Sequence, residues 1–244
     1  GVGELYQGDL DLGRLAVERL AASDLGGHVT IEDLHYGAVA VAQRLEETSP
    51  RSLVLVGAAA RGRPPGTVER RRVHPPLLAT DQVQAAVGDA VTGYVSIDLV
   101  VEVAAGLGAL PSRTVAIEVE PAVTGPVEGL SEPAAAGLER AVSLVTAEVR
   151  RAPVLDLADE LRPLCFDHRL DPSAALTAVQ DVLAGLAVLD EKGRWGSTFA
   201  RRERLRRALD AGQTSDQMDK LDWALWWSLL EELDRLIPLE ILGD

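Results

Sequence analysis

Cysteine, lysine and aromatic side chains are scarce in this chain of 244 residues. The single cysteine, Cys165, excludes an internal disulfide framework and is typical of a protein kept in a reducing compartment. No stretch of about 18 uncharged apolar residues occurs, so no transmembrane helix is predicted. The first residues are acidic and glycine-rich instead of basic and then apolar, so they do not resemble a signal peptide. We therefore expect a cytoplasmic protein.

Positive charge is also in short supply. The chain has 24 lysines and arginines against 38 aspartates and glutamates, which gives a net charge of −14. A surface of this sign repels phosphates, so we expect neither nucleic acid nor an anionic membrane as the main partner. Both lysines, Lys192 and Lys220, come late in the chain, so the glycine-rich opening lacks a Walker A lysine. Acidic residues also crowd the opening, where a dinucleotide site would need to hold a pyrophosphate.

Helical and extended patterns alternate over residues 1–151, as they do in an α/β sheet. The run SLVLVGAAA, residues 52–60, predicts a buried parallel strand, TVERRRV predicts an edge strand, and TVAIEVEP predicts a third strand. Ser131 is suited to cap the helix that follows, with Pro133 in its first turn. These elements predict a three-layer αβα domain. Because a glycine-rich turn of this kind normally follows a strand, we expect a first strand upstream of Gly1.

The composition changes at residues 151–153. All four tryptophans, both lysines and the only cysteine and methionine lie beyond this point. Helical patterns dominate there, which predicts a mainly helical C-terminal domain over residues 152–244. The segment DEKGRW, residues 190–195, has the composition of a hairpin turn after a helix, so a winged-helix-like organisation is one option for this domain.

The last predicted helix has two apolar stripes, which a single small neighbour cannot cover. One stripe contains several tryptophans, a residue type that often anchors protein interfaces. Two interpretations remain open: the helix packs within its own domain, or it presents a docking surface for a partner. In the second case the partner-binding residues are Trp223, Trp226, Trp227 and Leu230.

Several separate segments resemble one protein family. GVGELYQGDLDLG, residues 1–13, resembles the opening motif of the nickel-iron hydrogenase maturation endopeptidases. LVLVGAAARGRPPGTV resembles the strand and the following PGT turn of that family. GLGALPSRTVAIEVEPAVTGPVEGLS resembles its helix end, LP turn, third strand and next helix start. The segments occur in order and cover about residues 1–150, and nothing comparable covers residues 152–244.

The resemblance implies a twisted, mostly parallel sheet flanked by helices. It also implies an enzyme that removes a C-terminal tail from the hydrogenase large subunit after nickel insertion. The family senses nickel through two acids and a histidine, whose positions fall here on Leu10, Gly57 and Gly93, or on Ser96 in a shifted register. None of these residues binds a divalent metal well. We therefore expect no metal at these positions.

Other acidic residues could take over a metal-binding role. The candidate residual acidic site consists of Glu4, Asp9, Asp11 and Asp98, where Glu4 replaces the asparagine of the family motif and Asp9 matches its first acid. The simpler interpretation is that Asp9 and Asp11 cap a helix and interact with its positive N-terminus. The catalytic residues, if there are any, are not identified by the sequence.

Two functions fit these observations, and we favour the first. In the first, the chain is a non-catalytic pseudoenzyme, a binding or scaffold factor without a cofactor that engages a hydrogenase large subunit or another maturation factor. In the second, it is an active endopeptidase that uses nickel with substituted carboxylates. A third hypothesis, a winged-helix DNA reader, needs a basic recognition helix, whereas DPSAALTAVQDVLAGL contains no lysine or arginine.

Overall fold

The computed structural model describes residues 1–23, 25–27, 29–90 and 95–166. The chain forms two compact units, Gly1–Thr146 and Ala147–Asp244. The predicted helical domain beyond Phe166, including its winged-helix option and its tryptophan-rich last helix, lies outside the described residues. Across the part of the chain that is described, no helix combines the length and apolarity needed to span a bilayer.

The first unit is built on a small sheet. It contains β1 (Ser52–Ala58), β2 (Val68–Val73) and β3 (Arg113–Val119) in the order β1-β3-β2. β1 is parallel to β3, and β2 pairs with β3 in the antiparallel sense at the edge, as the alternation in TVERRRV predicted. Val2 adds a parallel bridge to Gly57 on the other side of β1. Every residue of β3 is buried, because both faces of a central strand are covered in this class of fold.

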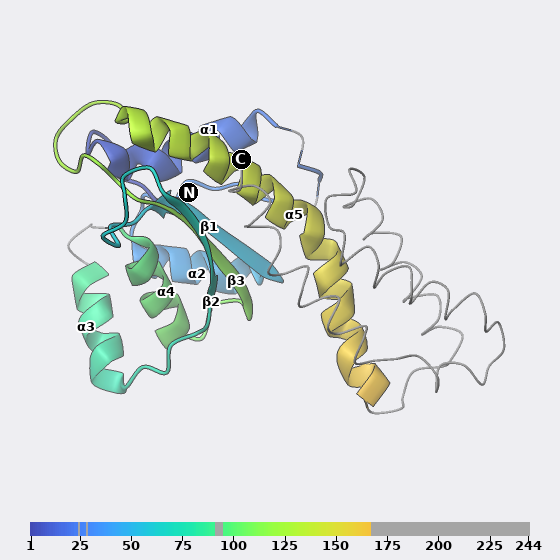
Figure 1. Ribbon diagram of the computed structural model, residues 1–244. Helices are drawn as coiled ribbons and strands as arrows, with labels where there is room; N and C mark the ends of the chain where they lie inside the picture. Colours follow the sequence, from blue (N-terminus) through green and yellow to red (C-terminus); the bar gives the residue numbers. More distant parts are fainter. Residues whose placement is uncertain (24, 28, 91–94, 167–244) are drawn as a thin grey trace, which may run out of the picture. The chain divides into compact units, whose positions relative to one another are not determined.

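Helices cover both faces of the sheet (Figure 1). On one side lie α2 (Ala38–Thr48), α3 (Thr80–Ala90) and α4 (Ile97–Gly106). Their buried residues form one apolar cluster with Leu55 of β1 and Ala116 of β3. The cluster is rich in alanine and valine, and within it α4 packs against both α2 and α3.

The opposite face is covered by α1 (Leu12–Ala21) and by the first part of α5 (Glu132–Phe166). Alternate residues of β3 point to this side, and α1 and α5 bury matching apolar side chains against it. The buried residues here include Leu12, Ala16, Val115, Ile117, Ala134 and Leu144. The predicted three-layer αβα architecture with a mostly parallel sheet is thus confirmed.

The starts of two helices follow ordinary capping chemistry. Ser131 Oγ accepts a hydrogen bond from Ala134 N at 3.3 Å, which confirms the predicted cap of α5. Ser96 Oγ accepts one from Leu99 N at 3.2 Å at the start of α4. The predicted domain boundary at residue 151 falls inside α5, which continues to Phe166 through the change in composition.

The opening segment lies between α1 and β1 and contacts both through the backbone of Val2. Val2 N donates to Val56 O at 2.8 Å, and the short 3-10 helix η1 (Asp9–Asp11) leads directly into α1. Gly13 of α1 lies against the Val2 backbone, and a side chain at this position would overlap the Val2 carbonyl group. The close approach of helix backbone to strand backbone therefore requires glycine.

Gly13→Ala should lower the free energy of unfolding by about 2 kcal/mol or more, because the added methyl group meets backbone atoms that cannot rotate away. Gly88→Ala is the matched control, since Gly88 also lies in a helix but has open space around it. Gly88→Ala should leave the free energy of unfolding unchanged or raise it by up to about 1 kcal/mol. Urea unfolding of both variants measures the difference, and equal effects would contradict the packing described.

Candidate functional site

Three segments meet at the carboxyl end of the parallel strands, where open α/β sheets usually bind ligands. These segments are the opening residues, the end of β1 and the residues that lead into α4. Glu4 joins two of them, because its Oε1 accepts a hydrogen bond from Val95 N at 3.2 Å. Gly57 joins β1 to the other two, since it bridges to Val2 and lies against the side chain of Ile97.

Two of the three positions that the family resemblance assigns to metal ligands can be placed here. Leu10 lies in η1, is partly exposed and has no donor atom in its side chain. Gly57 lies in β1, where a Cβ atom would be 2.5 Å from the carbonyl oxygen of Val2 and 3.5 Å from Cδ1 of Ile97. A carboxylate cannot occupy position 57 without movement of the Val2 backbone. Gly93 lies outside the described residues, and Ser96, its alternative, caps α4.

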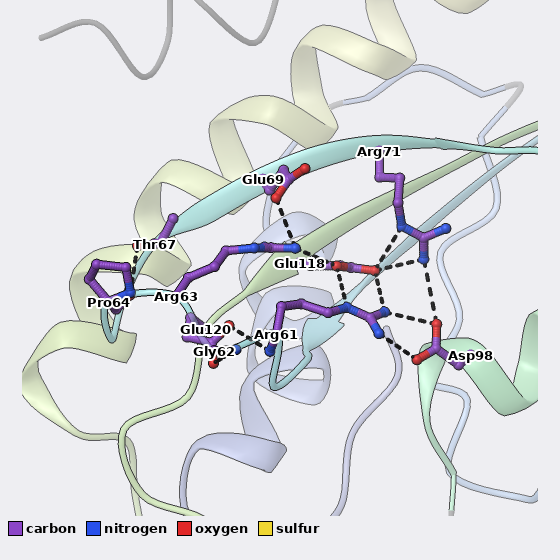
Figure 2. A network of polar contacts seen from close by, with 10 residues as sticks. All are labelled: Arg61, Gly62, Arg63, Pro64, Thr67, Glu69, Arg71, Asp98, Glu118 and Glu120. Carbon is purple, nitrogen blue, oxygen red and sulfur yellow. Dashed lines mark hydrogen bonds and ion pairs between the residues drawn. The ribbon is translucent and has the colours of Figure 1, made fainter.

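A buried glutamate dominates the chemistry of this edge. Glu118 of β3 is the register partner of Gly57, and its side chain has no solvent exposure. Figure 2 shows three arginines directed at its carboxylate. Arg71 Nη2 donates to Oε1 at 2.7 Å, Arg61 Nη2 donates to the same oxygen at 2.8 Å, and Arg63 Nη2 donates to Oε2 at 3.2 Å. The carboxylate is therefore fully committed to guanidinium groups.

Arg61 contacts three carboxylates, two through its guanidinium group and one through its backbone. Its Nη1 and Nη2 atoms donate to the two oxygens of Asp98, in the first turn of α4, at 2.7 and 2.8 Å. Its backbone N donates to Glu120 Oε2 at 2.8 Å, and Gly62 N donates to Oε1 of the same residue at 3.0 Å. Arg61 thus ties the loop after β1 to β3 and to α4 (Figure 2).

The guanidinium groups of this network are matched by an equal number of directly paired carboxylates. Arg63 also pairs with Glu69 at 2.8 Å, so three guanidinium groups face the carboxylates of Glu118, Asp98 and Glu69. A charge removed from water has to be paired and hydrogen-bonded, and bidentate guanidinium contacts do this well. These ion pairs hold the loop after β1 against the sheet and the start of α4.

The ionisation of Glu118 reflects these contacts. Burial by itself would raise the pKa of Glu118, but the hydrogen bonds and positive charges of Arg61 and Arg71 lower this pKa to about 2. The hydrogen bond to Glu118, followed by that to Asp98, raises the pKa of Arg61. Both partners remain charged over the whole physiological range, so neither is suited to exchange protons as a general acid or base.

Asp9 is a second buried carboxylate, but it serves a different part of the fold. Its Oδ2 atom accepts hydrogen bonds from Ala122 N at 2.7 Å, Val123 N at 2.9 Å and Ser131 Oγ at 2.8 Å. Its Oδ1 atom accepts one from Ser131 N at 2.7 Å. Burial tends to raise the pKa of Asp9, but these bonds bring it below its usual value. Asp9 therefore fixes the loop between β3 and α5.

The expectation that Asp9 and Asp11 cap their own helix is wrong. Asp11 occupies the N-cap position of α1, yet its side chain makes no capping hydrogen bond. Its oxygens instead accept from Arg14 Nε at 2.7 Å and from Arg14 Nη2 at 2.6 Å. The arginine one turn further along outcompetes the backbone N–H groups because its hydrogen bonds are charge-assisted and bidentate.

The structure does not bring the candidate residual acidic site together. Glu4, Asp9, Asp11 and Asp98 each bind different partners: Val95 N, the loop after β3, Arg14, and the arginine network, respectively. Within the residues that the structure describes, no group of three or more histidine, cysteine, aspartate or glutamate side chains could hold a metal ion. The partner-binding candidates Trp223, Trp226, Trp227 and Leu230 lie outside the described residues.

Sequence reasoning missed the arginines that dominate the site. The available signal was an acidic residue inside the buried strand TVAIEVEP, which needs a cation nearby. RGRPPG directly follows the neighbouring strand, and VERRRV places arginines on the edge strand. The pattern of these two runs predicts a loop and a strand, and it does not indicate which carboxylate their arginines reach.

Comparisons with known proteins give matches among solved structures only. No family model matches the sequence, and the search of curated proteins gives no match. A hydrogenase 2 maturation peptidase from a Thaumarchaeota archaeon is 22% identical, with a TM-score of 0.42, over 59% of this chain and 91% of that chain. The hydrogenase maturating endopeptidase HybD from Escherichia coli is 22% identical, with a TM-score of 0.44, over 62% and 90%. The endopeptidase HycI from Escherichia coli is 18% identical, with a TM-score of 0.44, over 60% and 86%.

Acid should weaken the fold through Glu118. Its folded-state pKa of about 2 lies below the ordinary 4.5, so its contribution to stability is complete above about pH 4.5 and is lost as the pH falls toward 2. Glu118→Gln should reduce stability near neutral pH by about 3 kcal/mol, because the arginines lose a buried partner, and should flatten this acid limb. Denaturant unfolding as a function of pH provides the measurement.

Glu102→Gln is the control for this experiment, since Glu102 is an exposed residue of α4. It should leave both the stability and the acid limb within about 0.5 kcal/mol of the wild type. An unchanged acid limb in Glu118→Gln would show that the guanidinium contacts do not hold this carboxylate ionised.

Asp9→Asn should destabilise the fold by about 2 to 3 kcal/mol. The amide NH₂ would face an N–H donor whichever way the side chain is turned, which leaves a buried donor without a partner. Asp11→Asn is the matched neighbour, since Asp11 is also buried but binds Arg14 within its own helix, and it should cost less than Asp9→Asn does because the asparagine oxygen can still accept a hydrogen bond from Arg14. Hydrogen exchange should accelerate at residues 122–131 in Asp9→Asn alone, and equal exchange in both variants would contradict the account.

Proposed function

We propose that this chain is a hydrogenase maturation protease-like protein that acts without nickel as a non-catalytic binding factor. Its partner would be a hydrogenase large subunit or another maturation factor. One observation carries the proposal: at the edge where the resemblance places a nickel site, Arg61 lies between the carboxylates of Glu118 and Asp98. The αβα fold and the motifs of the opening segment support the link to the family.

The donor set at this edge does not suit a divalent ion. Such an ion needs about three side chains with available lone pairs, and nickel favours imidazole and carboxylate. Leu10 and Gly57 provide neither, and Glu118 and Asp98 are already bound by a guanidinium group. A metal ion would have to displace the Arg61 guanidinium group, which would give up its charge-assisted hydrogen bonds to both carboxylates.

A binding role requires fewer structural features than a catalytic role does. It requires a stable fold and an exposed surface, whereas cleavage of a peptide bond also requires an activated water molecule or nucleophile. The network around Glu118 holds its charges in tight pairs, which lower the pKa of Glu118 to about 2 and raise the pKa of Arg61. We therefore propose that the protein shares the fold and the partner of the family but does not cleave the partner.

The alternative is an active endopeptidase that trims the C-terminal tail of a hydrogenase large subunit with substituted carboxylates. The closeness of Glu118 and Asp98, which share Arg61 Nη2 at 2.8 Å each, favours it. Rotation of Arg61 out of the network would present two carboxylates to a metal ion. This alternative predicts that divalent metal and Arg61 compete for the same place.

Incubation with a tail-bearing large subunit of a nickel-iron hydrogenase distinguishes the two functions. We expect the two proteins to co-elute in size-exclusion chromatography, and we expect mass spectrometry to find the tail still attached, with or without added nickel. Calorimetric titration with nickel or cobalt should give no binding heat. Micromolar nickel binding that Asp98→Asn abolishes, together with removal of the tail, would establish the endopeptidase instead. Failure of the two proteins to co-elute would remove the large subunit as the partner.

A further inference from the structure

Exposed apolar side chains gather on two loops of the first unit. Leu5 and Tyr6 belong to the opening segment and are 53% and 66% exposed, and Val123 and Val127 follow β3 and are 40% and 49% exposed. Contiguous apolar exposure on a soluble domain often marks a site of interaction. Residues 4–9 and 122–131 together form the two-loop surface.

The two loops are joined along their backbones. Gly8 N donates to Val127 O at 2.8 Å and Asp9 N donates to Val123 O at 2.9 Å. Gly8 also forms an isolated bridge with Thr124, and the buried carboxylate of Asp9 adds its four hydrogen bonds. The four apolar residues are therefore presented by one preformed platform, which reduces the entropic cost of binding. Figure 1 shows the segment between β3 and α5 at the same end of the sheet as the opening residues.

Tyr6 has an unusual backbone for its residue type. Its φ angle is 60°, in the left-handed region that glycine and asparagine adopt more readily. The surrounding hydrogen bonds, among them Glu4 N to Leu10 O at 3.0 Å, hold this conformation. Position 6 thus carries a tyrosine although glycine or asparagine would adopt this backbone conformation at a lower energetic cost. Tyrosine is a frequent anchor of protein interfaces.

Charge limits what can bind there. Residues 1–13 and 120–133 contain no lysine, arginine or histidine. Their acidic residues include Glu128 and Glu132, which are exposed beside the apolar positions of the second loop. An apolar surface with an acidic border complements an apolar segment flanked by basic residues. A second copy of this chain would bring the same acids together, with a net charge of −14 on each copy.

We propose that the two-loop surface docks an apolar segment of a protein partner that is flanked by lysines or arginines. The four apolar residues named above are its apolar contacts, and Glu128 and Glu132 attract the basic flanks. This inference rests on the proposed binding function and names the surface that performs it. The surface is separate from the arginine network, so it does not depend on the absence of nickel.

Fluorescence anisotropy with two short labelled peptides tests the surface directly. One peptide alternates leucine with lysine, and the other alternates leucine with glutamate. The wild type should bind the lysine peptide and not the glutamate peptide, and higher salt should weaken the binding. The triple variant Tyr6→Asn, Val123→Thr and Val127→Thr should bind the lysine peptide at least about tenfold more weakly.

These substitutions preserve the shape of the loops. Asparagine tolerates the left-handed backbone of position 6, and threonine has nearly the shape of valine. Leu77→Asn is the matched control, because Leu77 is a fully exposed apolar residue between β2 and α3, and it should bind as the wild type does. If the triple variant does not fold, Glu128→Gln with Glu132→Gln should still weaken binding of the lysine peptide severalfold.

Equal binding of the lysine peptide by the wild type and both sets of loop variants would overturn the inference, as would no binding by the wild type. A dimer of the wild type that the triple variant loses would assign the surface to self-association instead. The hydrogenase large subunit gives a separate result. Wild-type protein that binds the lysine peptide but not the large subunit would remove the proposed function alone. A triple variant that binds the large subunit as tightly as the wild type does would remove the inference alone.

Discussion

The carboxylate of Glu118 has to be neutralised inside the protein, and the way this is done governs the end of the sheet. Three arginines reach it from the loop after β1 and from the edge strand, and Arg61 continues to Asp98 at the start of α4. A buried charge without such partners would destabilise the fold by several kcal/mol. These ion pairs therefore link the loop after β1, the edge strand and α4 to the central strand, and they engage the carboxylates at this edge of the sheet.

Three acidic residues at this end of the first unit hold neighbouring segments in place by accepting hydrogen bonds. Asp9 holds the loop after β3 through backbone N–H groups and Ser131, Glu120 holds the backbone of the loop after β1, and Glu118 holds guanidinium groups. Each carboxylate is hydrogen-bonded and unavailable for other ligands. These contacts support the proposal that this end of the sheet serves in binding a partner.

The sequence predicted the fold well and the site less well. Periodicity and turn residues identified β1, β2, β3 and the cap of α5, because these depend on local pattern and burial. The partners of Asp9 were not predictable, since Ser131 N lies 122 positions away in the chain. Likewise, RGRPPG indicates a loop but not that Arg61 reaches Glu118, which depends on how β1 and β3 align. Single positions such as Leu10 and Gly57 could be evaluated in advance only because the family resemblance assigned them a role.

The central claim of the proposal is that Arg61 occupies the edge of the sheet at which the family resemblance places a metal ion. A crystal structure of the protein grown with excess nickel, measured at the nickel absorption edge, tests this claim most directly. The account predicts no anomalous peak beside Gly57, with Arg61 still bound to Glu118 and Asp98. A peak coordinated by Glu118 and Asp98, with Arg61 turned toward solvent, would contradict it.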